Sequence, residues 1–164
     1  MQNALTSAPS SPFASAFPLA PASRSHERVD GVQSDHRFVT LLDLYRGSGG
    51  LARAPEVASL FMRRCGDDVA VFAGWILKRE VICFEWHSKM WLPLFQFSGI
   101  DMAPPPILSQ VLAELVSVYD QWDVANWFVQ PQLWLAQRTP IDLLVSDPLA
   151  VLNAARAVRF VPAD

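Results

Sequence analysis

The chain has 164 residues, of which 51% are hydrophobic, 11% aromatic and 18% charged, with a formal net charge of −3. This length fits one domain with an appendage, and the aromatic side chains supply enough apolar surface for a core, which excludes a chain that is disordered throughout. The sequence has no run of about 18 apolar residues, so no membrane-spanning helix is expected. The acidic excess lies in residues 106–164, a region whose charge does not suit duplex DNA.

The first 25 residues include six Ser, six Ala and four Pro, and the first charge is Arg24. This composition predicts a flexible tail, which we extend to residue 35. The first hydrophobic run is 38–45, and the glycine-rich segment 46–50 ends it. That segment lacks the motifs of a phosphate or dinucleotide loop and is expected to be a plain connection.

Two adjacent helices are predicted next. Ala54-Pro55-Glu56 favours a helix start, Arg63-Arg64 suits its last turn, and Gly66 ends it. Asp67-Asp68 then opens a second helix that extends to about Lys78. The pair resembles a helix-turn-helix, but the second helix has an acidic first turn and an apolar body. A helix that reads DNA presents Arg, Asn, Gln or Ser, so we expect this one to be buried and DNA binding to be doubtful.

A β-hairpin is predicted after these helices. Residues 81–87 and 90–97 are rich in β-branched and aromatic side chains, and Ser88-Lys89 separates them. Pro93 is expected to place the second strand at a sheet edge or a bulge. Residues 36–100 therefore form a degenerate, winged helix-turn-helix-like half.

The remainder, 101–164, is predicted to be helical. Apolar residues recur at helical spacing over 107–119, and Asp120 and Asp123 suit the start of a helix that stops before Pro131. Thr139-Pro140 and Asp147-Pro148 each place a capping side chain before a proline in the first helical position. The sequence therefore predicts a mainly α fold, a bundle of about six helices with one inserted β-hairpin.

Few residue patterns point to chemistry. Glu85 and His87 alternate onto one strand face, which is typical of a solvent-facing polar row and, as the less favoured alternative, of an acid–base or ligand pair. Cys83 has only His87 as a nearby base, and Asp67-Asp68 suits a helix dipole better than a metal ion. Zinc and nucleophile-elbow motifs are missing from the sequence. We therefore expect a protein that is not an enzyme, with no catalytic, cofactor or metal residues. The two cysteines, Cys65 and Cys83, form no disulfide pattern and the first residues no secretion signal, so we expect a cytoplasmic location.

The C-terminal region resembles the toxin-binding domain of the Xre/MbcA/ParS antitoxin family. That family shows an Arg-Thr-Pro-Leu-Asp-Leu-Leu helix start and an Asp-Pro-Glu-Ala-Val-x-x-Ala-Ala-Arg helix, which are similar to residues 138–144 and 147–156. Residues 92–97, Leu-Pro-Leu-Phe-Gln-Phe, are similar to the segment that often precedes the domain. The similarity spans about residues 55–160. One departure is Leu135-Ala136-Gln137 where the family has Leu-Gly-Gly, which leads us to expect a different turn.

The resemblance implies an antitoxin that dimerises and covers the active site of a RES-type, NAD-degrading toxin with residues 101–164. By the same resemblance, the residues expected to contact the partner are Arg138, Thr139, Pro140, Asp142, Arg156 and Arg159. Arg156 and Arg159 are also expected to lie on the last helix, outside its core face. For Arg156, an alternative of equal weight is that its positive charge stabilises the negative end of the helix dipole at the helix C-terminus. A DNA-binding transcriptional regulator, and a family member with another protein partner, are the alternative functions.

Overall fold

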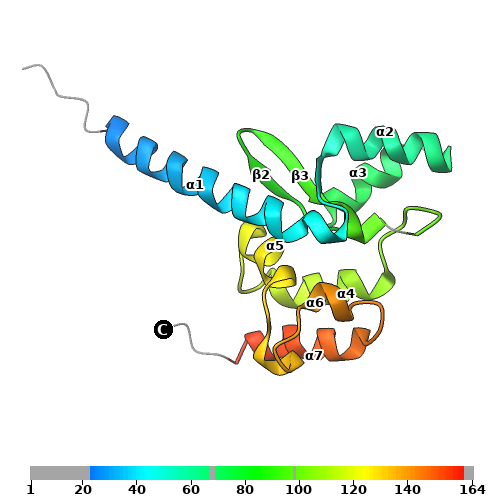
Figure 1. The fold of residues 1–164 in the computed structure, drawn as a ribbon. Coiled ribbons are helices and arrows are strands. Elements are labelled where there is room, and N and C mark those ends of the chain that lie inside the picture. Colours follow the sequence, from blue (N-terminus) through cyan, green and yellow to red (C-terminus); the bar gives the residue numbers. More distant parts are fainter. Residues whose placement is uncertain (1–22, 67–68, 98, 161–164) are drawn as a thin grey trace, which may run out of the picture.

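The computed structural model describes residues 23–66, 69–97 and 99–160, and Figure 1 shows a mainly helical fold with a small sheet. This confirms the predicted fold class, although seven α-helices occur in the described ranges rather than about six. In chain order the elements are α1 (Ser23–Tyr45), the 3-10 turn η1 (Arg46–Ser48), β1 (Leu51–Arg53), α2 (Ala54–Cys65), α3 (Val69–Leu77), β2 (Phe84–Trp86), β3 (Lys89–Pro93), η2 (Leu94–Phe97), α4 (Pro106–Leu115), α5 (Gln121–Val129), η3 (Leu133–Leu135), α6 (Pro140–Leu143) and α7 (Pro148–Val158).

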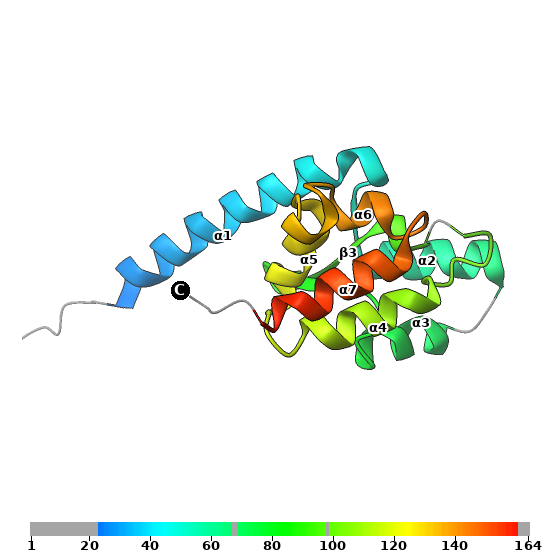
Figure 2. The same cartoon turned by 90° about the horizontal axis from the view of Figure 1, so that it is seen from below.

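Helix α1 corrects the expectation of a tail that reaches residue 35, because it begins at Ser23; residues 1–22 lie outside the described ranges. Its C-terminal half is anchored by Phe38, Leu41 and Tyr45, which share one helix face and are buried. Figures 1 and 2 show its N-terminal half extending beyond the rest of the fold. Tertiary packing of the apolar end therefore supports a helix that continues into polar sequence.

The hairpin belongs to a three-stranded antiparallel sheet in the order β1-β3-β2. The expectation of an edge position for the second strand is wrong, since β3 is the central strand. Beyond Trp91, which pairs with Phe84 of β2, the strand has only β1 beside it, and Pro93 pairs with Leu51 there. Proline is tolerated at this end of the central strand because one side of the ladder has already stopped. The second strand is also shorter than predicted, since residues 94–97 form η2.

Helices α2 and α3 confirm the predicted helix pair, with Gly66 as the left-handed C-cap of α2 (φ 64°). Residues 67 and 68, predicted to open the second helix, lie outside the described ranges. The two helices pack through Phe61, Phe72 and Trp75, with the rings of Phe61 and Trp75 5.5 Å apart. The expectation that α3 is buried all round is wrong. Its opposite face is exposed, and Phe72 is its one fully buried residue.

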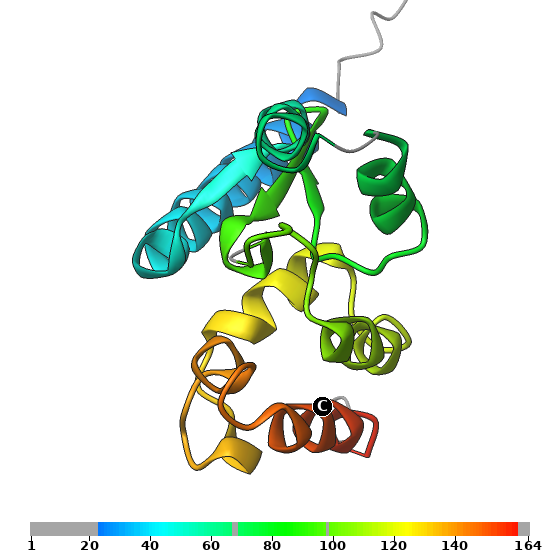
Figure 3. The ribbon, with the colours of Figure 1, turned by 90° about the vertical axis from the view of Figure 1, so that its right-hand side faces the viewer.

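The C-terminal helices begin where their capping residues predict. Asp120 accepts a hydrogen bond from the backbone N–H of Asp123 (2.8 Å) at the start of α5, and Asp147 accepts one from that of Ala150 (3.2 Å) at the start of α7. Figure 3 shows α7 packed against α4 at the end of the molecule away from the sheet.

One hydrophobic core runs through both halves of the chain. It joins Phe38, Leu41 and Tyr45 of α1 and Phe84 of β2 to the buried faces of α4, α5, α6 and α7. A second cluster lies between α2, α3 and the sheet. Residues 36–100 and 101–164 therefore contribute to one shared core, and the predicted division at residue 100 stays a prediction. No helix in the described ranges is long and apolar enough to cross a membrane.

Candidate functional site

The motif from Arg138 to Asp142 starts a helix, and only part of it faces solvent. Pro140 is buried as the first residue of α6, which leaves little of its side chain for the partner contact predicted for it. The hydroxyl of Thr139 donates to the carboxylate of Asp142 (2.5 Å), which ties the cap to the first helical turn. Arg138 and Asp142 are exposed and remain available to a partner.

The turn before this helix contains two consecutive left-handed residues, Ala136 (φ 53°) and Gln137 (φ 62°). Such a conformation favours glycine, and these are the positions where the antitoxin family has Gly-Gly. The replacement therefore does not by itself imply the different turn that we expected. Backbone hydrogen bonds from Gln132 N–H to the Arg138 carbonyl and from Gln137 N–H to the Gln132 carbonyl, both 3.0 Å, close the loop.

This closed loop carries η3, from which Leu133 and Trp134 project into solvent. With Val145, Leu149 and Phe160 they make up what we call the C-terminal apolar surface, whose members have exposed fractions from 63% to 85%. Both η3 and α6 pack against α7. Tryptophan is enriched in protein interfaces and is a frequent hot spot there. An exposed tryptophan on a loop held by its own hydrogen bonds is a suitable anchor for a protein partner.

The outward stripe of α7 consists of Leu149, Asn153 and Arg156, and Phe160 follows in the turn after the helix, at a spacing of i, i+4, i+7 and i+11. All four are exposed, whereas Val151, Leu152, Ala154 and Ala155 of the same helix are buried. Arg156 donates to the side-chain oxygen of Asn153 (3.4 Å) at the centre of the stripe. The stripe therefore has polar groups at its centre and the exposed apolar side chains of Leu149 and Phe160 at its two ends.

Arg156 and Arg159 also form ion pairs within the fold. Nε of Arg156 lies 3.4 Å from Oε1 of Glu114, and Nη2 of Arg159 lies 3.1 Å from Oε2 of the same carboxylate. Arg159 further donates to the hydroxyl of Ser117 (3.2 Å). The two arginines thus join α7 to α4 through one acidic side chain, a role that differs from the helix-terminus alternative considered for Arg156.

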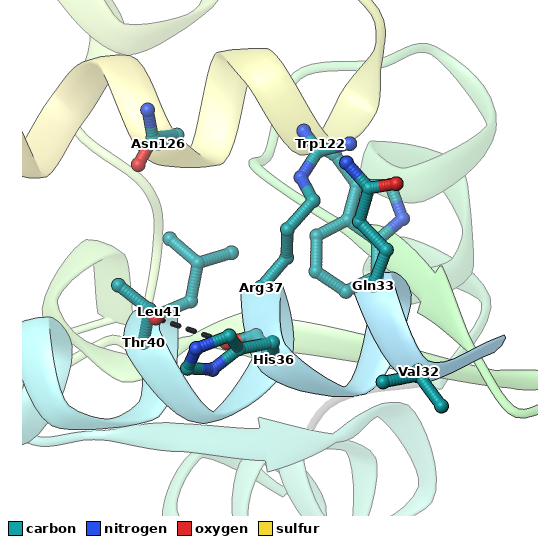
Figure 4. A pocket seen from close by; sticks show the side chains of 8 residues that line it. All are labelled: Val32, Gln33, His36, Arg37, Thr40, Leu41, Trp122 and Asn126. Atoms are coloured by element: carbon teal, nitrogen blue, oxygen red, sulfur yellow. Dashed lines mark hydrogen bonds between the residues drawn. The ribbon is translucent and has the colours of Figure 1, made fainter. Parts of the chain in front are cut away.

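A groove of about 710 Å³ lies between α1 and α5. Figure 4 shows the eight side chains that line it, from two helices that are far apart in sequence. Arg37 pairs with Asp123 (2.9 Å), and its guanidinium lies 5.3 Å from the centre of the Trp122 ring. We call this cavity the α1–α5 groove; its lining residues are Val32, Gln33, His36, Arg37, Thr40, Leu41, Trp122 and Asn126.

Sequence reasoning missed this groove because it assigned the N-terminal half of α1 to a tail. The sequence pattern that could have indicated a helix in this segment is weak. Val32 and Val39 are seven residues apart on one helix face, but the residues between them are largely polar. The contribution of α5 depends on contacts across more than eighty residues, as between Arg37 and Asp123, and no local pattern predicts these.

The residues considered for catalysis are not assembled for it. His87 lies in the hairpin turn with φ 49°, beyond the end of β2, and its Nε2 is 2.7 Å from Oδ1 of Asp35 rather than beside Glu85. The hydrogen bond from His87 lowers the pKa of Asp35. Burial raises the pKa of the Cys83 thiol, which disfavours the reactive thiolate. The described residues hold no cluster of three or more His, Cys, Asp or Glu that could bind a metal ion.

The exposed face of α3 bears on DNA recognition. Its outward residues include Ala70, Val71, Ala73 and Leu77, none of which has a side-chain hydrogen-bonding group. Direct readout of base edges needs such groups. The helix in the second position of the helix-turn-helix therefore presents an apolar surface.

Comparisons with protein-family models, with curated proteins and with solved structures give no match for this chain.

Proposed function

We propose that this chain is a non-enzymatic, antitoxin-like binding protein that covers the active site of a RES-type, NAD-degrading toxin in the bacterial cytoplasm. The observation that carries the proposal is the C-terminal apolar surface, with Trp134 on the closed η3 loop, Leu149 on α7 and Phe160 in the turn after it. This surface coincides with the part of the sequence that resembles the toxin-binding domain.

The exposed side chains of this surface support a partner with a concave site. Leu133 and Trp134 of η3 project into solvent, and an apolar anchor of this kind binds best in a pocket where it is desolvated. The same region also presents polar groups, on Asn153 and Arg156 within the stripe and on Arg138 and Asp142, which are exposed. Protein interfaces combine apolar anchors with such hydrogen-bonding groups.

The test is inhibition of a purified RES-type toxin, measured as NAD consumption against concentration of this protein. We expect the chain to suppress consumption, and Trp134→Asp and Leu149→Asp to weaken suppression at least about tenfold, since each places a charge at a desolvated contact. Leu77→Asp, which changes an exposed leucine on α3 (84% exposed, against 66% for Leu149), is the control and should leave suppression unchanged. Unaltered NAD consumption in a formed complex would contradict the proposal.

Transcriptional regulation is the alternative function, since α2, α3 and the hairpin follow each other as in winged DNA-binding domains. The apolar outward face of α3 argues against it. Tight duplex binding that weakens steeply as salt rises would favour this alternative over the antitoxin proposal.

A further inference from the structure

A cavity of about 210 Å³ lies between the segment that follows α3, the C-terminal end of α4 and the start of α5. We call it the α4–α5 pocket. Its floor is aliphatic, since Ile82, Leu112 and Val124 line it and are buried. Its rim carries two exposed charged residues, Arg79 and Asp120. Apolar walls with a few polar groups at fixed places are the usual composition of a small-molecule site.

The guanidinium of Arg79 is available to a ligand. In the described part of the chain it forms no hydrogen bond and no ion pair. Its charge acts on the floor of the pocket, because burial raises the pKa of the Cys83 thiol while the charge of Arg79 lowers it. Arg79 follows α3 in a left-handed conformation (φ 57°). Glycine would adopt this conformation with less strain but would bring no positive charge to the pocket.

Asp120 places a negative charge on the same rim. Its Oδ1 accepts the hydrogen bond from the Asp123 N–H that caps α5. Within the described ranges, Asp120 and Arg79 form no ion pair with each other, so a ligand that lies between them can contact both charges. The hydroxyl of Tyr119 and the side-chain amide of Gln121 add neutral hydrogen-bonding groups to the rim.

We propose that the α4–α5 pocket binds a small aliphatic α-amino acid, such as valine or leucine, as the zwitterion. The carboxylate of the ligand pairs with the guanidinium of Arg79, whose planar donors match a carboxylate. The ammonium group of the ligand pairs with the carboxylate of Asp120. The branched side chain of the ligand packs on the aliphatic floor and is removed from water there. Each charge of the ligand thus meets the opposite charge, and its apolar part meets the apolar part of the pocket.

The volume of the pocket favours an amino acid of intermediate size. Liquid water occupies about 30 Å³ per molecule, so a cavity of about 210 Å³ has room for about seven to nine non-hydrogen atoms, as in valine and leucine. Tryptophan is too large for this space, and alanine leaves much of the aliphatic floor uncovered. A carboxylic acid without an amino group would leave Asp120 without a counter-charge, and an amine would leave Arg79 without one.

Titration calorimetry of the full chain with L-valine and L-leucine tests the proposal. We expect saturable binding with a dissociation constant between about 10 µM and about 1 mM, as suits a ligand of so few atoms. Isovalerate, which is valine without its amino group, and isobutylamine, which is valine without its carboxylate, should bind at least about tenfold more weakly, and L-tryptophan should not bind. Equal binding of isovalerate, or no saturable binding of either amino acid up to about 10 mM, overturns the proposal.

Substitutions assign the two rim charges. Arg79→Gln and Asp120→Asn should each weaken binding of L-valine at least about tenfold, because each removes one charge-assisted contact. Asparagine caps helices as well as aspartate does, so Asp120→Asn leaves the start of α5 intact. The matched controls are Arg64→Gln, at an exposed arginine of α2, and Asp147→Asn, at the cap of α7, and both should bind as the unmodified chain does. If Arg79→Gln or Asp120→Asn binds L-valine as tightly as its control, the proposed pairing is wrong.

A nuclear magnetic resonance titration of the unmodified chain places the ligand without any substitution. L-Valine should shift the backbone amide signals of residues 79–83 and 119–121, which line or flank the pocket. The pocket shares no residue with the C-terminal apolar surface, so this result does not depend on a toxin partner. Shifts confined to other parts of the chain would show that the α4–α5 pocket is not the site.

Discussion

The side-chain amide of Gln96 pairs with both backbone polar groups of Ile82. Oε1 of Gln96 accepts from the Ile82 N–H (2.8 Å), and Nε2 donates to the Ile82 carbonyl (2.9 Å) and to that of Pro93 (3.0 Å). Gln96 is fully buried, and it is the only buried polar or charged residue in the described part of the chain. Its side chain takes the place of the strand partner that the chain lacks just before β2 begins.

Gln96→Leu should therefore lower the free energy of unfolding by about 2–4 kcal/mol, because it leaves two backbone groups of buried Ile82 without partners. Urea unfolding measures the change. Gln110→Leu, at an exposed position of α4, should alter stability by less than about 0.5 kcal/mol. Equal effects of the two substitutions would contradict the assigned role of Gln96.

Tyr45 predicts a loss of stability at alkaline pH. Its hydroxyl donates to the carbonyl of Ala125 (2.6 Å), and burial raises the pKa of this phenol far above its usual value near 10. The folded chain then keeps a proton that the unfolded chain releases above about pH 10, so stability falls by up to about 1.4 kcal/mol per pH unit there. Tyr45→Phe should flatten this decline in urea unfolding between about pH 9 and pH 11. Tyr119→Phe, which changes the other tyrosine of the chain, is the control and should retain the decline of stability.

The parts of this fold that could be predicted are those with local causes. Asp120 and Asp147 cap helices with their own side chains, and the outward stripe of α7 follows helical spacing. Helix α1 could not be predicted, since its polar N-terminal half depends on Phe38 and Tyr45 packing against distant elements. Strand β1 is three residues long and is defined only by its pairing with β3.

Some features of the candidate site could likewise be predicted from the sequence, and others could not. Arg156 and Arg159 could be placed on the last helix from its spacing, but their shared contact with Glu114 joins two helices that are distant in sequence. Pro140 shows that a correct motif assignment does not predict the burial of a residue. A motif can identify a residue correctly as a helix start without revealing that the same residue is buried.

Asp35 predicts an acid-dependent contact between α1 and the hairpin. Its Oδ1 is bonded by His87 Nε2 (2.7 Å) and by Trp86 Nε1 (3.1 Å), and the hydrogen bond from His87 is the main cause of its lowered pKa. A carboxyl group with a lowered folded pKa stabilises above its ordinary pKa, and the benefit disappears as pH falls through the folded value. Asp35→Asn should therefore melt below the unmodified chain at pH 6, and this difference should shrink as the pH falls below about 4.

Asp43→Asn is the matched control for this experiment, because Asp43 is an exposed carboxylate of α1 that pairs only with Arg46, one turn away. Exposed ion pairs of this kind contribute little to stability. The melting temperature of Asp43→Asn should therefore stay close to that of the unmodified chain. A difference between Asp35→Asn and the unmodified chain that persists unchanged at pH 3 would show that the carboxylate charge is not its cause.

The left-handed residues before α6 predict a stabilising substitution. Ala136 and Gln137 adopt φ values of 53° and 62°, a conformation that costs an L-residue about 1–2 kcal/mol. Glycine avoids this strain but gives up about 0.5–1 kcal/mol through the entropy of the unfolded chain. Ala136→Gly and Gln137→Gly should each raise the free energy of unfolding by about 0.5–1 kcal/mol in urea titrations. Ala113→Gly, at an exposed position of α4, should lower it by about 1 kcal/mol. The opposite signs separate relief of strain from a general effect of glycine, and a loss of stability at positions 136 and 137 would show that the loop is not strained there.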